Sequence, residues 1–169
     1  FKKGFETAGF FCFEFQHWEA DDVIASLAKK SAYVGLSSTI ISTDKGFFQL
    51  VDQRIQVLNH FDRQLFNEEE VRARYSIDAT QLNDLLALTG DTTNHLPGVK
   101  GIGIKTATDL LTQYQDLDTL LIQLPELELK PKLKEALETQ WRSALLTRKL
   151  AKLVIDLPLG INLNDMRLK

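Results

Sequence analysis

The 169-residue sequence predicts an α/β domain built on a parallel sheet, followed by a region that is almost wholly helical. Two observations support the first part: short apolar runs typical of buried strands occur before residue 67, and segments of helical periodicity alternate with them. The third observation is a change of character at Asn67, where an N-cap residue precedes three glutamates and only helical patterns follow. We therefore divide the chain into residues 1–66 and 67–169.

The first part begins with a helical pattern that ends at Gly9. The aromatic run Phe10–Phe15 predicts a buried strand, and the acidic start and apolar face of Glu19–Lys30 predict a helix. Ser38–Thr43 is rich in β-branched residues, which predicts a second buried strand. Strand, helix and strand in this order predict a βαβ unit of a parallel, Rossmann-like sheet.

The remaining elements follow from the same patterns. The first part continues with a short helix over Lys45–Leu50, a strand near Ile55–Leu58 and an edge strand over Arg63–Phe66. In the second part, we expect helices over Glu68–Tyr75, Ala79–Thr89, Ile104–Tyr114, Leu117–Gln123 and Lys132–Ile155.

Composition excludes several classes of protein. The sequence is 44% hydrophobic and 25% charged with a net charge of -3, which argues against a uniformly basic DNA-coating protein. No apolar run is long enough to span a membrane, and no signal peptide is visible. The single cysteine, Cys12, has no internal disulfide partner, so we expect a reducing, cytoplasmic location. Because the only methionine is Met166, we expect the chain to be the C-terminal part of a longer protein.

Carboxylates follow both strands of the predicted βαβ unit. Glu19, Asp21 and Asp22 come after the first strand, and Asp44 ends the second. Ligands of open parallel sheets bind beyond the carboxyl ends of the strands, and clustered carboxylates suit Mg²⁺ or Mn²⁺. The alternatives are ordinary: acids in a first helical turn contribute about 0.3–1 kcal/mol each, and Asp44 can be an N-cap. Asp91 follows Gly90, where a turn role is the alternative to a metal role.

A glycine-rich turn, Gly98–Thr106, separates two of the predicted helices. It matches neither the dinucleotide fingerprint nor the P-loop. Backbone N–H groups at the start of a helix favour an anion such as a phosphate, and Lys100, Lys105 and Thr106 add two charges and a hydroxyl. We favour a helix-hairpin-helix contact with the DNA backbone over an ordinary interhelical turn. We interpret the basic residues of Lys130–Lys152 as a solvated helix face, with DNA contact as the alternative.

In this order the motifs resemble the flap endonuclease (5′-nuclease) family, and within it the bacterial exonuclease IX subfamily is most similar. The resemblance covers nearly the whole chain and rests on three motifs. They are Glu19-Ala20-Asp21-Asp22, then Ser42-Thr43-Asp44-Lys45-Gly46 with Gln49-Leu50, then Gly90-Asp91 leading into Leu96-Pro97-Gly98-Val99-Lys100-Gly101-Ile102-Gly103-Ile104-Lys105-Thr106-Ala107.

The resemblance implies a PIN-like nuclease core followed by a helix–three-turn–helix module that grips duplex DNA. It places Glu19, Asp21 and Asp22 at a first, catalytic divalent-metal site and Asp44 and Asp91 at a second. It also implies a K⁺ site made largely of backbone carbonyls, at Leu88, Thr89, Pro97, Val99 and Ile102. The DNA contacts it implies are those of the hairpin, Lys100, Gly101, Ile102, Gly103, Ile104, Lys105 and Thr106.

Two departures from the family pattern concern the second metal site. The family usually has Asp-Lys-Asp where this chain has Asp44-Lys45-Gly46, and Gly-Asp-x-x-Asp where this chain ends in Asn94. Exonuclease IX is similarly depleted, so the departures favour that subfamily and weaken the second site.

The resulting hypothesis is a Mg²⁺-dependent monomeric bacterial nuclease of DNA replication and repair that cuts 5′-flap or branched DNA without regard to sequence. One alternative is a related protein that binds branched DNA but cuts it weakly or not at all. Another is an α/β phosphohydrolase that does not act on DNA.

Overall fold

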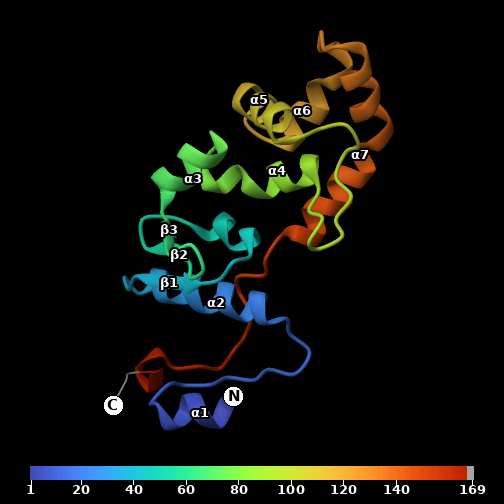
Figure 1. Cartoon of the computed structure of the whole chain (residues 1–169). Helices are drawn as coiled ribbons and strands as arrows, with labels where there is room; N and C mark the ends of the chain where they lie inside the picture. The colour runs from blue at the N-terminus through green and yellow to red at the C-terminus, as the bar shows by residue number, and fades with distance from the viewer. Residues whose placement is uncertain (167–169) are drawn as a thin grey trace.

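A computed structural model describes residues 1–166 of the chain (Figure 1). Its three-stranded sheet has the order β1 (Ser38–Ile41), β2 (Ile55–Asn59), β3 (Gln64–Phe66). β1 and β2 are parallel, with Ser38 opposite Ile55, and β3 adds an antiparallel edge. The parallel pair confirms the α/β fold class, and β3 confirms the expected edge strand.

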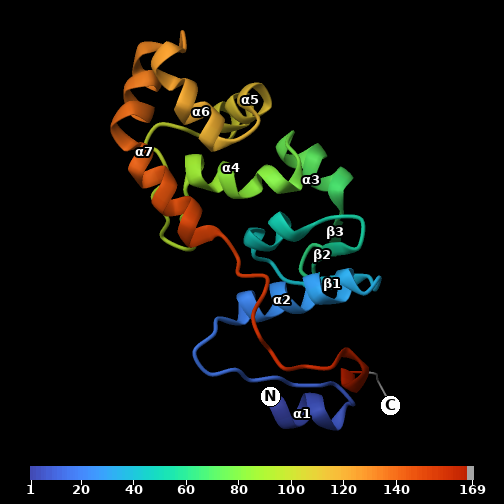
Figure 2. The ribbon, with the colours of Figure 1, turned by 180° about the vertical axis from the view of Figure 1, so that it is seen from behind.

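Helix α2 (Ala20–Tyr33) covers one face of the sheet, and the 3₁₀ helix η1 (Lys45–Leu50) lies on the other side with the helices of the second part (Figures 1 and 2). α2 buries Ala25 and Ala28, three residues apart on one face, in the hydrophobic core. The same hydrophobic core also contains residues of η1, the sheet and the following helices, among them Phe47, Phe48, Leu50, Ile55, Val57, Phe66, Leu82 and Leu88.

The second part is helical from Glu68 to Ala151, apart from its connecting turns. None of the helices within residues 1–166 has the length and apolar character needed to cross a bilayer. The helices of the chain not yet given are α1 (Lys2–Thr7), α3 (Glu68–Tyr75), η2 (Ala79–Gln81), α4 (Leu82–Thr89), α5 (Ile104–Tyr114), α6 (Leu117–Gln123), η3 (Leu124–Glu126), α7 (Pro131–Ala151) and η4 (Leu163–Met166).

The expected bounds of α3, α5 and α6 are confirmed, and α3 begins at the cap that the sequence indicates. Asn67 caps α3 by accepting from the backbone N–H of Glu70, and Asp116 caps α6 by accepting from that of Thr119. The expected short helix Lys45–Leu50 is a 3₁₀ helix, and the expected helix Ala79–Thr89 begins with a 3₁₀ turn, Ala79–Gln81, before α4. Short 3₁₀ pieces are common at such helix starts and connectors.

The predicted strand Phe10–Phe15 is wrong, and with it the βαβ unit that began there. These residues form no strand in the described chain, and Phe10, Phe11 and Phe13 remain 53%, 43% and 43% exposed. The aromatic rings instead pack on their neighbours, Phe10 against Phe5 and Phe13 against Phe15. An aromatic run becomes a strand only when another strand pairs with it, and no strand within residues 1–166 does so.

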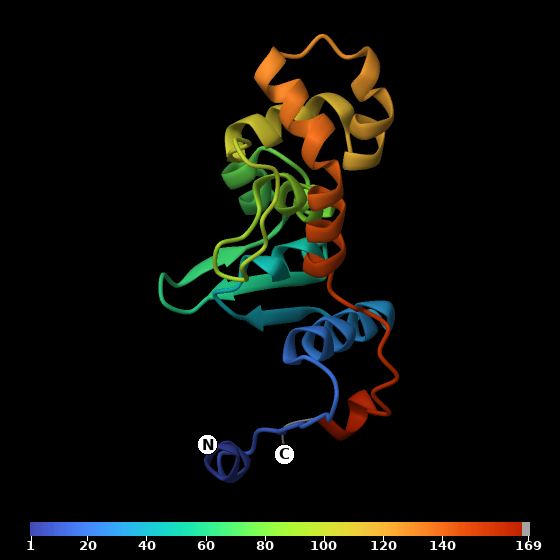
Figure 3. The ribbon, with the colours of Figure 1, turned by 90° about the vertical axis from the view of Figure 1, so that its right-hand side faces the viewer.

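Helix α7 ends at Ala151 rather than at the expected Ile155, because side chains of the first part bind the backbone that follows. The C-terminal segment (residues 152–162) runs back along α2 toward the N-terminus (Figures 1 and 3). Ser26 Oγ donates to Val154 O at 3.1 Å and accepts from Leu157 N at 3.1 Å. Lys30 Nζ donates to Ile161 O at 2.5 Å. Side-chain partners thus replace the helical hydrogen bonds that the segment gives up.

The start of the hairpin packs against the end of α4 at two glycines with positive φ. A Cβ on Gly98 would lie 2.2 Å from Gly90 N, and one on Gly90 would lie 2.5 Å from Leu96 O. Both contacts are with backbone, which cannot rotate away. Gly98 N also donates to Oγ1 of the buried Thr147, so α7 fixes the same point. Only glycine fits at these two positions.

We therefore expect Gly98→Ala to lower the free energy of unfolding by more than about 3 kcal/mol, since strain and a backbone clash add. Gly101→Ala is the matched control: its φ is also positive, at 93°, but nothing lies within 4 Å of the added Cβ. That variant should lose only about 1 kcal/mol. Urea unfolding of both variants measures the difference, and equal losses would contradict the packing argument.

Candidate metal and nucleic-acid site

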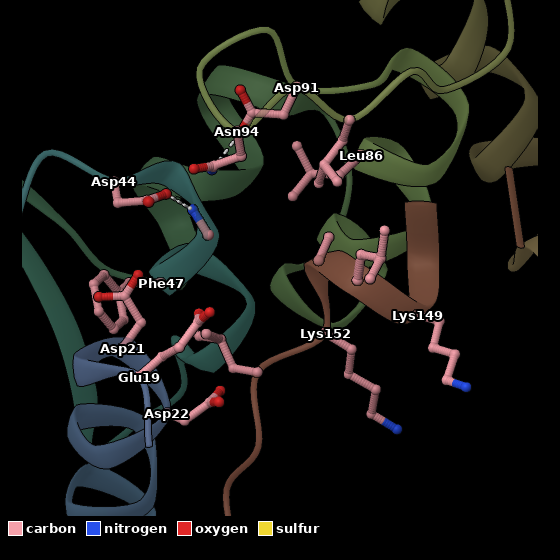
Figure 4. A pocket seen from close by; sticks show the side chains of 15 residues that line it. Glu19, Asp21, Asp22, Asp44, Phe47, Leu86, Asp91, Asn94, Lys149 and Lys152 are labelled. Atoms are coloured by element: carbon pink, nitrogen blue, oxygen red, sulfur yellow. Dashed lines mark hydrogen bonds between the residues drawn. The ribbon is translucent and has the colours of Figure 1, made fainter. Parts of the chain in front are cut away.

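A cavity of about 420 Å³ lies where α2, η1, the end of α4 and the end of α7 meet (Figure 4). All five carboxylates that the sequence singled out line it: Glu19, Asp21, Asp22, Asp44 and Asp91. The structure therefore brings together residues that are 72 positions apart at most. The expected strand before Glu19 is absent, yet the acidic start of α2 still faces the cavity, because α2 packs on the sheet beside η1.

Local backbone structure explains where the first four acids lie. Glu19 is the N-cap residue of α2, and Asp21 and Asp22 occupy its first turn. Asp44 caps η1, with Oδ1 accepting from Gly46 N at 2.7 Å. The ordinary N-cap role that the sequence allows for Asp44 is thus present in the structure, and it leaves the other carboxylate oxygen available to the cavity.

Asp91 is engaged within its own turn. Its Oδ1 accepts from Thr93 N at 2.9 Å, and its Oδ2 accepts from Asn94 Nδ2 at 3.0 Å. A backbone bridge between Asp91 and Leu96 closes the loop on both sides. Asn94 itself lines the cavity, so an amide occupies the position at which the family pattern has a carboxylate.

Asp21 carries the strongest electrostatic signal of the group. Burial is the largest cause that raises the pKa of Asp21, and the negative charges of Asp44, Glu19 and Asp22 raise it further. Within residues 1–166 its carboxylate accepts no hydrogen bond. A raised pKa means that the ionised form is disfavoured in the folded protein, and a bound cation would relieve this cost.

The donors in this cavity have the chemistry of a hard-cation site. Carboxylate and amide oxygens suit Mg²⁺ or Mn²⁺, whereas the cavity offers no sulfur or imidazole ligand. Within the described residues, however, no three His, Cys, Asp or Glu side chains stand close enough to enclose one ion. Mg²⁺ is commonly held by one or two carboxylates and keeps several waters, so the residues present fit such an ion.

The tip of the glycine hairpin, between α4 and α5, is exposed. Gly101 has a φ of 93°, and Lys100 and Lys105 are exposed, whereas Ile102 is buried and anchors the turn. α5 begins at Gly103 with no side-chain cap and no acidic residue in its first turn. Its positive N-terminal end therefore remains unopposed, as phosphate binding at a helix N-terminus requires.

The positions expected at a K⁺ site lie together where the hairpin meets α4. Leu88 O accepts from Val99 N at 2.9 Å, and Val99 O accepts from Ile102 N at 3.1 Å. Thr89 and Pro97 flank the Gly90–Gly98 contact. The structure brings these five residues into one loop cluster, and ion binding there stays a prediction.

Sequence reasoning did not place two features of the structure at this site. Lys149 and Lys152 line the cavity opposite the acids, a position that the sequence does not indicate: it suggests a solvated helix face for this basic stretch, with DNA contact as the alternative. Gln49 belonged to a motif without an assigned function, but its amide joins η1 to the segment after α7. Gln49 Nε2 donates to Ala151 O at 3.0 Å, and its Oε1 accepts from Leu153 N at 3.2 Å.

Comparison with known families agrees with this architecture. Residues 1–76 match the profile described as the 5′-3′ exonuclease, N-terminal resolvase-like domain, and residues 77–169 match that of the 5′-3′ exonuclease, C-terminal SAM fold. The chain belongs to the 5′-3′ exonuclease family. The resemblance drawn from the three sequence motifs is confirmed at this level, and the exact domain boundary stays a prediction.

Curated relatives carry the name flap endonuclease Xni. The protein from Colwellia psychrerythraea is 46% identical over 150 residues, which is 89% of this chain and 51% of that protein. The relative from Shewanella oneidensis is 46% identical over 151 residues, 88% of this chain and 56% of its own length. The chain thus spans about half the length of the curated relatives it matches.

Solved structures share the fold. A mutant of the T5 5′-exonuclease superposes with a TM-score of 0.78 at 25% identity, covering 93% of this chain and 63% of that one. T5 5′-exonuclease with bound zinc superposes with a TM-score of 0.81 at 24% identity, covering 90% and 57%. These similarities confirm the fold, an α/β core followed in sequence by a helical module.

The raised pKa of Asp21 predicts that this carboxylate lowers the stability of the metal-free protein at neutral pH. Because the pKa of Asp21 is raised in the folded state, its ionisation destabilises the fold at pH values above its pKa in the unfolded chain. We expect Asp21→Asn to raise the thermal unfolding midpoint of the metal-free protein at pH 7, and the gain to fade as the pH falls below 4. Asp62→Asn, on an exposed turn, is the control. An unchanged or lowered midpoint for Asp21→Asn at pH 7 would contradict the repulsion.

Proposed function

We propose that the protein is a divalent-metal-dependent, structure-specific 5′-nuclease that hydrolyses phosphodiester bonds of 5′-flap or branched DNA in replication and repair. The observation that carries this proposal is the acidic wall of the cavity, in a chain of the 5′-3′ exonuclease family. The name of the curated relatives, flap endonuclease, and the bound zinc of the T5 5′-exonuclease support it.

The five carboxylates that line the cavity form its acidic wall, and in this scheme they hold a hard cation beside the bond to be cut. Asp21 is the principal ligand, because burial and the charges of its neighbours raise its pKa and no protein donor in the described chain relieves it. Asp22 lies beside it in the first turn of α2, and Glu19 is the N-cap residue. Asp44 and Asp91 serve a second, weaker position. Mg²⁺ or Mn²⁺ bound here supplies Lewis-acid polarisation of the phosphodiester and activation of the attacking water.

In this scheme the hairpin binds the DNA backbone and does not read the base sequence. Its contacts are the backbone N–H groups of the turn and of the α5 start, from Gly101 to Thr106, together with the ammonium groups of Lys100 and Lys105. All of these groups bind phosphate oxygens, which are the same for every base sequence. K⁺ at the carbonyls near Leu88 and Val99 would add positive charge to this surface. We expect the protein to act as a monomer in the cytoplasm, where reducing conditions suit the free thiol of Cys12.

A specific observation favours a second candidate, a protein of the same fold that binds branched DNA but cuts it weakly or not at all. Gly46 contributes no side chain beside Asp44, and Asn94 donates to Asp91 instead of adding negative charge. Both changes remove charge from the second metal position. The two candidates share the hairpin and differ in whether a product forms.

Cleavage of a labelled 5′-flap by the full-length protein in Mg²⁺ decides between them. We expect product from the wild type and a loss of at least about 100-fold in rate for Asp21→Asn. Mutating even a group that only orients a metal ligand lowers metal affinity or activity about 10–100-fold, and Asp21 is proposed as a ligand itself. DNA binding should be unchanged in that variant. Glu138→Gln, on the exposed face of α7, is the control that should cut normally. A wild type that gives no product at any Mg²⁺ or Mn²⁺ concentration supports the binding protein instead.

The hairpin predicts how binding responds to salt. Lys100→Ala with Lys105→Ala should weaken binding to all DNA sequences alike and reduce the slope of log affinity against log salt by about 2, one for each lost phosphate contact. Fluorescence anisotropy in KCl and in NaCl measures this, and tighter wild-type binding in KCl is expected if K⁺ joins the surface. A loss confined to some base sequences would refute backbone gripping.

A further inference from the structure

Two lysines lie on the side of the acidic cavity opposite the carboxylates. Lys149 is in the last turn of α7 and Lys152 follows its end, and both line the same 420 Å³ cavity as Glu19, Asp21 and Asp22 (Figure 4). Both lysine side chains extend away from the carboxylates, so their ammonium groups lie at the outer side of the cavity (Figure 4). In the part of the chain that the structure describes, neither lysine forms an ion pair, so the cavity keeps its two walls apart.

The backbone around Lys152 is fixed by the elements that carry the acids. Gln49 binds it on both sides, through Ala151 O and Leu153 N, and the same amide nitrogen donates to Gly46 O at 2.8 Å in η1. One residue further, Val154 N donates to Asp22 Oδ1 at 2.8 Å. The position at which Lys152 leaves the chain is therefore set relative to both η1 and α2.

A simpler role for these lysines is to complement the negative end of the α7 dipole. Arg148 already provides a cation in that last turn, where it pairs with Asp118 at 2.8 Å and with Asp84 at 3.5 Å. Lys152 lies outside the helix, with extended backbone at φ −75° and ψ 120°. The dipole therefore does not account for a lysine held at this point by three side-chain hydrogen bonds to its neighbours.

We propose that Lys149 and Lys152 form a phosphate-binding wall that contacts the backbone of the nucleic-acid strand lying in the acidic cavity. The inference rests on the proposed function and names the groups that hold the strand against the acidic wall. A polyanion entering this cavity meets five carboxylates on one side, which repel it unless a cation is bound, and two free ammonium groups on the other. The lysines are positioning residues: they place phosphates next to the bond that is cut and do not take part in the chemistry.

The test measures flap-DNA binding by the full-length protein in EDTA, so that no cleavage occurs and no metal contributes. For Lys149→Gln with Lys152→Gln, we expect the slope of log affinity against log salt to fall by about 2, and affinity at 0.1 M salt to fall on the order of tenfold or more. The double variant Lys149→Arg with Lys152→Arg keeps both charges and should bind like the wild type. Lys3→Gln, on α1 at the far end of the molecule, is the single-charge control for Lys152→Gln (Figure 1).

Unchanged affinity and salt slope in the glutamine double variant would overturn the proposal, and so would an equal loss in the arginine variant, because that loss would be structural. If wild type and variants unfold at the same midpoint, a weaker affinity reflects a lost phosphate contact and not a damaged fold. If the double variant fails to fold, the two single glutamine variants replace it, and each should lower the slope of log affinity against log salt by about 1. A wild type that neither binds nor cuts flap DNA refutes the proposed function as a whole. Normal cleavage and binding by the glutamine double variant refutes only the lysine wall.

Discussion

Mutual repulsion among carboxylates on one wall of a cavity is the constraint on which the rest of the site depends. The fold reduces it by giving most of these acids a hydrogen-bond donor. Val154 N donates to Asp22, Gly46 N to Asp44, and Thr93 N and the Asn94 amide to Asp91. Donors of this kind stabilise the charged form of a carboxylate and so let several ionised groups share one region. Asp21 and Glu19 have no such donor in the described chain, and Asp21 is the one whose pKa is raised by burial and by its neighbours, which makes it the point where a cation relieves the most repulsion.

The same hydrogen bonds join the two parts of the chain. Asp22 and Ser26 on α2 and Gln49 on η1 bind the backbone that follows α7, and α7 in turn supports the hairpin through Gln140 and Thr147. The hairpin is thus connected to the acidic wall through one continuous helix, α7. The individual bonds contribute about 0.5–1.5 kcal/mol each, and their value lies in fixing the two surfaces relative to each other rather than in total stability.

The sequence predicted those features that depend on local signals. The cap at Asn67 gave the start of α3, helical periodicity gave the bounds of α6, and the acids at the starts of α2 and η1 gave residues of the cavity wall. It failed where the outcome depends on distant partners. Phe10–Phe15 has the composition of a strand but no strand pairs with it, and α7 stops at Ala151 because Gln49, Asp22 and Ser26 bind the next residues. The place of Lys152 at the cavity was equally hidden, since nothing near it in sequence indicates that its surroundings come from η1 and α2.

The two departures from the family pattern, Gly46 and Asn94, change how the carboxylates beside them are compensated. A carboxylate at position 94 would replace the amide that donates to Asp91 Oδ2 at 3.0 Å, and two negative groups would then face each other at that distance. Such a pair is tolerated only with a cation between them, because like charges this close cannot both ionise. Asn94 removes that requirement, and Asp91 becomes a hydrogen-bond acceptor that closes its own loop. With Gly46 leaving Asp44 to cap η1, the charge that stays uncompensated is concentrated on α2. We infer that any ion this wall retains is held from the α2 side, and that the opposite side of the cavity is left to orient the strand.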